Sequence, residues 1–199
     1  MSKIQANQIQ HTANGAAVFT LPQTDGSANQ VVKTDGSGTL SFGAGGISMM
    51  DNWRLASGLV ASTQDLTSGW ERNDSNFSKI GAGMTESSGI FTFPETGIYR
   101  IDFSVGATHT NQQVRYIGGI ILLTDNGLDS GFAERASGYQ SLSNDVVPYC
   151  NVYLTAIFDV TNTSTHKAKF RVEAEHSITY DGSSSSNRTY AIFTRLGDT

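Results

Sequence analysis

The sequence is poor in charged residues and in cysteine. Only 16% of its 199 residues are charged, and the formal net charge is −5. Nucleic acids and anionic membranes attract basic surfaces, so this charge argues against binding to either of them. Cys150 is the only cysteine in the chain, which excludes an intrachain disulfide framework.

Long apolar segments are also missing. The sequence contains no run of about 18 apolar residues, the length that a membrane-spanning helix needs. Its first ten residues, MSKIQANQIQ, are polar and lack the apolar segment of a signal peptide. No stretch repeats its apolar residues with the 3.6-residue period of a helix. We therefore expect an all-β chain that is made in a cytosol and does not insert into a membrane.

The motifs of common enzymes and metal sites are absent as well. The sequence has no G-x-S-x-G, no phosphate-binding loop and no pair of histidines at metal-ligand spacing. Glu173 and Glu175 are two residues apart, but Lys169 and Arg171 precede them on the same strand face, which indicates a solvated charged stripe and not a glycosidase pair. Cys150 falls on an inward strand face, where it acts as a small hydrophobe. We predict no enzyme activity, no cofactor and no metal.

Residues 89–105, GIFTFPETGIYRIDFSV, give the clearest structural signal. They read as two strands joined by a tight corner, because Pro94 fixes φ and Gly97 tolerates a positive φ. The second strand alternates strictly, which is typical of a half-buried strand. Its inward face carries Tyr99, Ile101, Phe103 and Val105.

Three further runs have strand patterns. Residues 148–160 and 167–177 each have one clean apolar face, whereas residues 114–124, VRYIGGIILLT, are apolar on both faces. A strand that is apolar on both faces must be covered on both. Since no helix is predicted, a subunit interface would supply the second cover. Residues 132–148 read as a long surface connection, and residues 180–187 as a mobile loop.

Apolar outer faces therefore predict an interface between copies of the chain, where aromatic residues are enriched. The alternative is that the facing of one strand has slipped by one residue, which would turn these side chains inward. The predicted trimer-interface residues are Tyr116, Ile121, Tyr149, Tyr153, Tyr190 and Ile192.

Residues 1–46 differ from the rest, and we assign residues 47–199 to the folded domain. The motif TDGS occurs at 24–27 and again at 34–37, and each Asp-Gly is a hairpin-type turn signal. The apolar runs around them are too short to build a core, so the segment is either a flexible leader or an arm that docks on a partner. Termini become ordered when they are tied down, and we favour the docking arm.

The corner carries a resemblance to a known family. Its pattern, Gly, aromatic, x, aromatic, Pro, x, x, Gly, x, Tyr, resembles the early strands of the tumour-necrosis-factor-like jelly roll of complement globular heads, and residues 187–196, NRTYAIFTRL, are similar to its closing strand. The resemblance implies a two-sheet antiparallel jelly-roll sandwich, trimeric through a sheet face. Here an extended N-terminal arm would precede it.

Residues 53–99 further resemble jelly-roll heads of tailed-bacteriophage structural proteins, and the arm resembles the starts of phage fibre and appendage proteins. This implies a homotrimeric virion appendage, a head fibre, capsid decoration or short tail-fibre tip, whose arm docks on capsid or tail proteins. The expected location is the virion.

A rival hypothesis is a receptor- or glycan-binding head for host attachment. Loops tolerate variation while the sheets hold the trimer, so a ligand would bind at loops, and the candidates are 107–113, 125–131, 136–147 and 180–187. Calcium could use oxygen ligands in residues 125–129, although turn chemistry explains those residues. The candidate ligand residues are Asp125, Asp129, Tyr139 and Tyr180.

Overall fold

In the computed structural model the chain forms two units, Met1–Ser48 and Met49–Thr199. We refer to the first as the arm and to the second as the head. The structure describes residues 6–10, 18–28, 30–108, 114–142 and 149–199. Within these ranges, only the backbone of Ala44 and Asp129 is described.

The described part of the arm consists of two short hairpins. β1 (Gln8–Gln10) pairs with β2 (Val18–Thr20), and β3 (Gln30–Thr34) pairs with β4 (Leu40–Ala44). The Asp35–Gly36 turn joins β3 to β4 as predicted: the Asp35 carboxylate accepts hydrogen bonds from the backbone N–H of Ser37 and Thr39, which lower its pKa. The Asp25–Gly26 pair was wrongly predicted to close a hairpin, because β2 and β3 do not pair with each other.

The arm leaves its apolar side chains in contact with solvent. Hairpins this short cannot bury an apolar face by themselves. The exposed side chains belong to Ile9, Val18, Phe19, Val31 and Val32.

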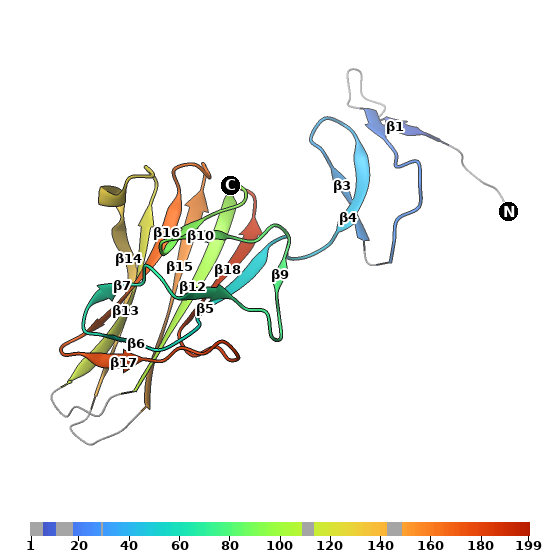
Figure 1. The fold of residues 1–199 in the computed structure, drawn as a ribbon. Helices are drawn as coiled ribbons and strands as arrows, with labels where there is room; N and C mark the ends of the chain where they lie inside the picture. The colour runs from blue at the N-terminus through green and yellow to red at the C-terminus, as the bar shows by residue number, and fades with distance from the viewer. Residues whose placement is uncertain (1–5, 11–17, 29, 109–113, 143–148) are drawn as a thin grey trace. The chain divides into compact units, whose positions relative to one another are not determined.

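In its described part, the head is a sandwich of two antiparallel sheets (Figure 1). We name each sheet after its longest central strand. The β12 sheet contains β6 (Leu59–Ala61), β17 (Ile178–Tyr180), β12 (Gly97–Thr108), β18 (Tyr190–Gly197), β5 (Met50–Leu55) and β8 (Trp70–Arg72) in this order, with β15 (Tyr149–Val160) beside β12 and β9 (Lys79–Ile80) beside β5. The β13 sheet contains β10 (Thr85–Ser87), β11 (Ile90–Thr92), β16 (Lys167–Ala174), β13 (Tyr116–Thr124) and β14 (Ala133–Ser141), with β7 (Gln64–Asp65) beside β16. A short 3₁₀ turn, η1 (Asp129–Gly131), lies between β13 and β14.

The predicted corner is confirmed. Gly97 has φ +145°, and a Cβ there would lie 2.5 Å from the carbonyl oxygen of Gly197, so only glycine fits. The hydroxyl of Tyr99 donates to the carbonyl of Glu95 at 2.9 Å, which satisfies this buried polar group. The predicted inward residues of β12 are all fully buried.

Aromatic rings form the centre of the core between the sheets. Phe91 lies 5.5 Å from both Trp53 and Phe170, and 5.1 Å from Phe193, measured between ring centroids. Offset and edge-to-face pairs at such distances stabilise a core beyond the area they bury. These rings come from β5, β11, β16 and β18, so the cluster joins both sheets.

The structure corrects the facing of residues 114–124. Ile121 was predicted at the interface, but it is fully buried in the core with Ile117 and Leu123. The outward residues are Ile120 and Leu122, which are only 4% and 5% exposed. Their register partners on β16 are Arg171 and Lys169, and long cationic side chains cover neighbouring apolar surface with their alkyl stems. Both cations pair with Asp65 of β7. No second subunit is needed to cover this strand.

Three other expectations change. Residues 133–141 form the strand β14 and not a surface connection, because they pair with β13 along its length. Tyr180 was predicted in a ligand loop, but it is fully buried and donates a hydrogen bond to the carbonyl of Ser62. The loop before β18 is held in place by Arg54, as described below.

Candidate interface and ligand surfaces

The outward face of the β12 sheet carries exposed aromatic and apolar side chains. Tyr149, Tyr153 and Ile157 alternate along β15 with buried residues and are 73%, 53% and 61% exposed. Tyr190 and Ile192 of β18 face the same way and are half-buried. Five large apolar groups on one sheet face form an exposed patch of the kind that marks interaction surfaces.

Polar contacts fix the orientation of Tyr153 within this patch. Its hydroxyl donates to the Asp102 carboxylate at 2.7 Å and accepts from the Arg100 guanidinium at 3.2 Å. Asp102 is 6% exposed and also pairs with Arg100 at 3.0 Å. The hydrogen bond to Asp102 is the main reason that the pKa of Tyr153 is raised. The ring is therefore held rigid at the surface.

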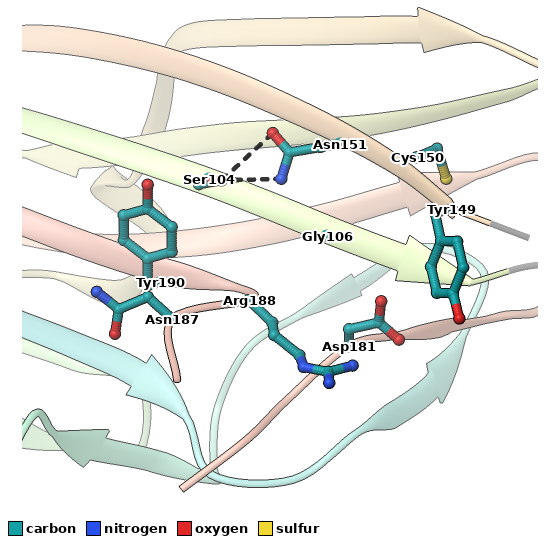
Figure 2. Close-up of a pocket in the computed structure, with 9 residues that line it drawn as sticks. All are labelled: Ser104, Gly106, Tyr149, Cys150, Asn151, Asp181, Asn187, Arg188 and Tyr190. Atoms are coloured by element: carbon teal, nitrogen blue, oxygen red, sulfur yellow. Dashed lines mark hydrogen bonds between the residues drawn. The ribbon is translucent and has the colours of Figure 1, made fainter. Parts of the chain in front are cut away.

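An open hollow of about 590 Å³ lies at one end of this face (Figure 2). The rings of Tyr149 and Tyr190 stand on its two sides, and Arg188 and Asp181 lie between them. Asp181 accepts a hydrogen bond from the Thr108 hydroxyl at 2.9 Å. Arg188 is exposed and makes no side-chain hydrogen bond or ion pair with any residue that the structure describes.

Cys150 borders the hollow but is not activated as a nucleophile. It is 8% exposed, as predicted for a small hydrophobe, and its thiol donates to the carbonyl of Ala107 at 3.3 Å. Burial, assisted by the negative charge of Asp181, raises the pKa of the thiol to about 11. The reactive thiolate is therefore scarce at neutral pH.

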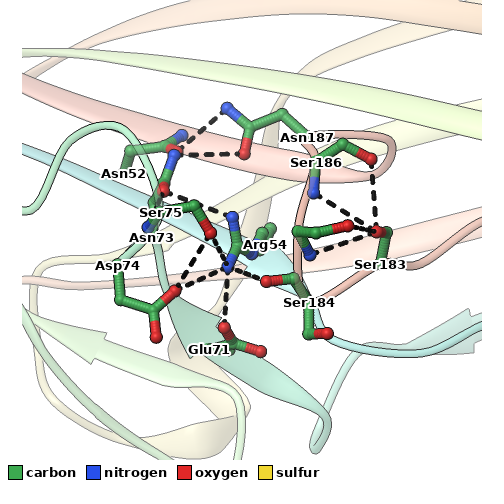
Figure 3. Close-up of polar contacts among 11 residues, drawn as sticks. Asn52, Arg54, Glu71, Asn73, Asp74, Ser75, Ser183, Ser184, Ser186 and Asn187 are labelled. Atoms are coloured by element: carbon green, nitrogen blue, oxygen red, sulfur yellow. Dashed lines mark hydrogen bonds and ion pairs between the residues drawn. The ribbon is translucent and has the colours of Figure 1, made fainter.

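A buried arginine holds the loops beside the hollow (Figure 3). Arg54 is 1% exposed and its Nη2 pairs with Glu71 and Asp74, each at 2.8 Å. The same nitrogen donates to the carbonyl of Ser184. Arg54 thus joins the segment 71–75 to the serine-rich loop 183–186, so the loop that its composition predicted to be mobile has an anchor at Ser184.

Three asparagines extend this network toward the hollow. The side-chain oxygen of Asn52 accepts from Asn73 at 2.8 Å and from Asn187 at 3.0 Å. Asn187 lines the hollow. The network therefore sets the position of one wall of the hollow from the same, outward face of the sheet.

The outward face of the β13 sheet carries a second polar and aromatic group. Tyr139 of β14 is 53% exposed, and its ring centroid lies 5.9 Å from that of Tyr116 in an edge-to-face arrangement. Both hydroxyls donate to Glu173 of β16, Tyr139 at 3.1 Å and Tyr116 at 3.4 Å. Each tyrosine has a raised pKa, first through burial and then through Glu173, whose charge is the second cause at Tyr116 and whose hydrogen bond is the second cause at Tyr139.

The predicted interface residues thus fall in three places. Tyr149, Tyr153, Tyr190 and Ile192 share the outward face of the β12 sheet, whereas Tyr116 lies on the opposite sheet and Ile121 in the core. The sequence prediction placed all six residues in one interface because residues 114–124 are apolar on both faces. A strand with that pattern does not show which of its faces points inward.

The predicted ligand residues do not come together. Asp125 is exposed in the loop after β13, the side chain of Asp129 is outside the described part, Tyr139 lies on a strand, and Tyr180 is buried. The residues 109–113 and 143–147 of two predicted ligand loops are also outside the described part. Sequence reasoning missed Arg188 and Glu173 as site residues. It also missed Asn151, which lines the hollow and donates to the Ser104 hydroxyl at 3.0 Å. No local motif marks any of the three.

The described residues contain no group of three or more histidine, cysteine, aspartate or glutamate side chains placed to hold a metal ion. In the same part of the chain, no helix reaches the length and apolarity that crossing a bilayer requires.

Comparison with known proteins by sequence gives no relative. No protein-family model matches the chain, and no curated protein matches it significantly.

Comparison of structures does find relatives in fold. Eiger TNF from S. frugiperda superposes with a TM-score of 0.56 at 12% identity, covering 75% of this chain and 93% of that one. Murine APRIL, crystallised at pH 5.0, superposes with a TM-score of 0.52 at 16% identity, covering 74% of this chain and 99% of that one. The head is therefore a tumour-necrosis-factor-like jelly roll, as the corner at residues 89–99 predicted. At these identities the likeness establishes the fold alone.

Proposed function

We propose that this protein is a non-enzymatic structural protein of a tailed-bacteriophage virion. In this proposal it is a homotrimeric appendage, a head fibre, capsid decoration or short tail-fibre tip, and its N-terminal arm anchors it to capsid or tail proteins. The outward face of the β12 sheet carries the proposal, because its exposed tyrosines and isoleucines need a cover.

A second and a third copy of the chain are the proposed cover. Tumour-necrosis-factor-like heads, which residues 89–99 resemble, form three-fold trimers on this kind of sheet face. Tyr153 supports an interface role, since Asp102 and Arg100 hold its ring in one orientation and a rigid aromatic side chain loses little entropy on binding.

The arm supports the anchoring part of the proposal. Its described hairpins leave Ile9, Phe19 and Val32 56%, 39% and 55% exposed. Such side chains gain a buried environment only from a partner. The resemblance of the arm to the starts of phage fibre proteins gives the class of that partner, another virion protein.

Light scattering of the purified protein tests the trimer. We expect three copies at micromolar concentration, and monomers after Ile157→Asp, because this change buries a carboxylate at the proposed interface. The side chain of Ile157 is 61% exposed and belongs to no core cluster, so the subunit itself should stay folded.

The control for this test is Tyr139→Asp on the opposite sheet, at a side chain that is 53% exposed, close to the 61% of Ile157. It should remain trimeric with an unchanged circular dichroism spectrum. A monomeric wild-type protein, or an Ile157→Asp protein that stays trimeric, would contradict the proposed interface.

Host attachment is the second candidate function. It is favoured by one observation, the group formed by Tyr116, Tyr139 and Glu173 on the face of the head opposite to the proposed interface. A surface placed there stays accessible when the β12 sheets of three copies meet.

A further inference from the structure

The ring of Tyr139 lies across the backbone of β13. Tyr139 on β14, Gly118 on β13 and Glu173 on β16 occupy one row across three strands, because Gly118 pairs with both of the others. A Cβ at Gly118 would lie 2.5 Å from Cε1 and 2.6 Å from Cδ1 of Tyr139. The missing side chain thus lets the ring rest on the sheet, and Tyr139 spans the glycine to reach Glu173 with its hydroxyl.

Three contacts keep the ring in this position while one side of it stays open. Tyr116 packs edge-to-face against the ring at an interplanar angle of 70°. The hydroxyl of Tyr139 donates a hydrogen bond to Oε2 of Glu173, with 3.1 Å between the oxygens. The backbone of Gly118 lies beneath the ring. The side chain is nevertheless 53% exposed. Ser137 and Ser141 flank it on the same face of β14, and both are exposed.

We propose that Tyr139 and Glu173 form a binding site for a neutral saccharide. The open face of a fixed aromatic ring stacks on the apolar C–H face of a pyranose, and it does so at low entropic cost because the ring does not have to be ordered. The carboxylate of Glu173 accepts only one hydrogen bond per oxygen from the two tyrosines. It keeps lone pairs for sugar hydroxyls at the edge of the ring.

The charges around the ring select against acidic sugars. The charges that act on the ring are those of two carboxylates, Glu173, which accepts its hydrogen bond, and Glu134 of the same strand. Arg115 and Arg171 of this face are paired, with Glu175 and Asp65. The exposed Arg135 lies four residues along β14 from Tyr139, about 13 Å away at 3.3 Å per residue. An anionic saccharide stacked on the ring would meet a carboxylate and no cation of the described residues within contact, so the ligand class is neutral.

This inference deepens the host-attachment function and does not depend on the trimer, because all the contacts of the site lie within one chain. The test uses the full-length protein on a panel of immobilised neutral oligosaccharides that contain glucose, galactose or N-acetylhexosamine, with sialylated oligosaccharides as the acidic set. Light scattering of the same samples reports the oligomeric state separately.

We expect the wild type to bind one or more neutral oligosaccharides and none of the sialylated set. Tyr139→Ala should weaken binding at least ten-fold. Gly118→Ala should weaken it as well, because the new methyl group lifts the ring off the sheet without removing it. Tyr139→Phe should retain part of the binding, since the stacking face remains while the bond to Glu173 is lost. The control Leu128→Ala, at another exposed apolar side chain, should bind like the wild type.

Two results would overturn the proposal. The first is a folded wild-type protein that binds no neutral oligosaccharide of the panel, or binds only the sialylated ones. The second is binding that Tyr139→Ala and Gly118→Ala leave unchanged. A failure of the trimer prediction would appear only in the light scattering, so the two proposals fail independently.

Discussion

At the scale of single residues, buried charge decides the arrangement of the loops. Arg54 is enclosed with Glu71 and Asp74 as partners, and its Nε is a buried donor without a hydrogen bond among the described residues. A buried charge is tolerated only when it is paired. The alternation of side chains along β5 places Arg54 on the outward face of the sheet. The segments 71–75 and 183–187 cover it there and bury it.

Removal of this arginine should destabilise the head. We expect Arg54→Met to lower the free energy of unfolding by roughly 3 kcal/mol, near the lower end for breaking a buried ion pair, because Glu71 and Asp74 still reach solvent. Urea unfolding at fixed protein concentration measures the loss.

Arg188→Met is the matched control for that measurement. Arg188 is exposed and unpaired within the described residues, so its loss should change the free energy of unfolding by less than about 0.5 kcal/mol. Equal effects of the two substitutions would show that the Arg54 network does not hold the loops.

At the scale of elements, the arm and the head differ in how they become stable. The strands of the head share one aromatic core, whereas the hairpins of the arm expose their apolar residues. The head therefore has its own source of stability, whereas the described hairpins of the arm have no core of their own.

Deletion of residues 1–45 separates the two roles. The truncated head should keep the circular dichroism spectrum of a folded β-protein, because its first core residue is Met49, and it should no longer sediment with virus particles. If the truncated head still decorates particles, the arm is not the anchor.

At the scale of the whole molecule, ion pairs between strands make stability depend on pH. Burial opposes ionisation of Asp65, but the hydrogen bonds and charges of Arg171 and Lys169 outweigh it and lower the pKa. Hydrogen bonds from Arg115 lower the pKa of Glu175 to about 2. Both groups have unfolded-state pKa values of about 4. Their stabilisation is therefore complete above pH 5 and is lost as the pH falls through 4 toward 2.

The corresponding prediction concerns Asp65→Asn. This substitution should lower stability at pH 7 and flatten the decline between pH 4 and pH 2.5, since one group that binds a proton on unfolding is gone. Urea midpoints at pH 7, 4, 3 and 2.5 measure the slope. Asp125→Asn, in an exposed loop, should leave the slope as it is in the wild type, and a slope in Asp65→Asn as steep as that of the wild type would refute the role of this ion pair.

The sequence by itself determined the strands whose two faces differ in polarity. Residues 99–105 and 167–174 alternate strictly, so burial of their apolar faces leaves one orientation. The corner at 94–97 was equally readable, because proline and glycine restrict the backbone locally.

Only the tertiary structure decided the rest. Ile121 and Tyr116 belong to a strand that is apolar on both faces, so the packing of β13 against β12 chose the inward side. The row of Tyr139, Gly118 and Glu173 joins residues far apart in the chain through strand register, and local patterns do not encode that register. The burial of Arg54 likewise requires two loops that meet only in the folded head.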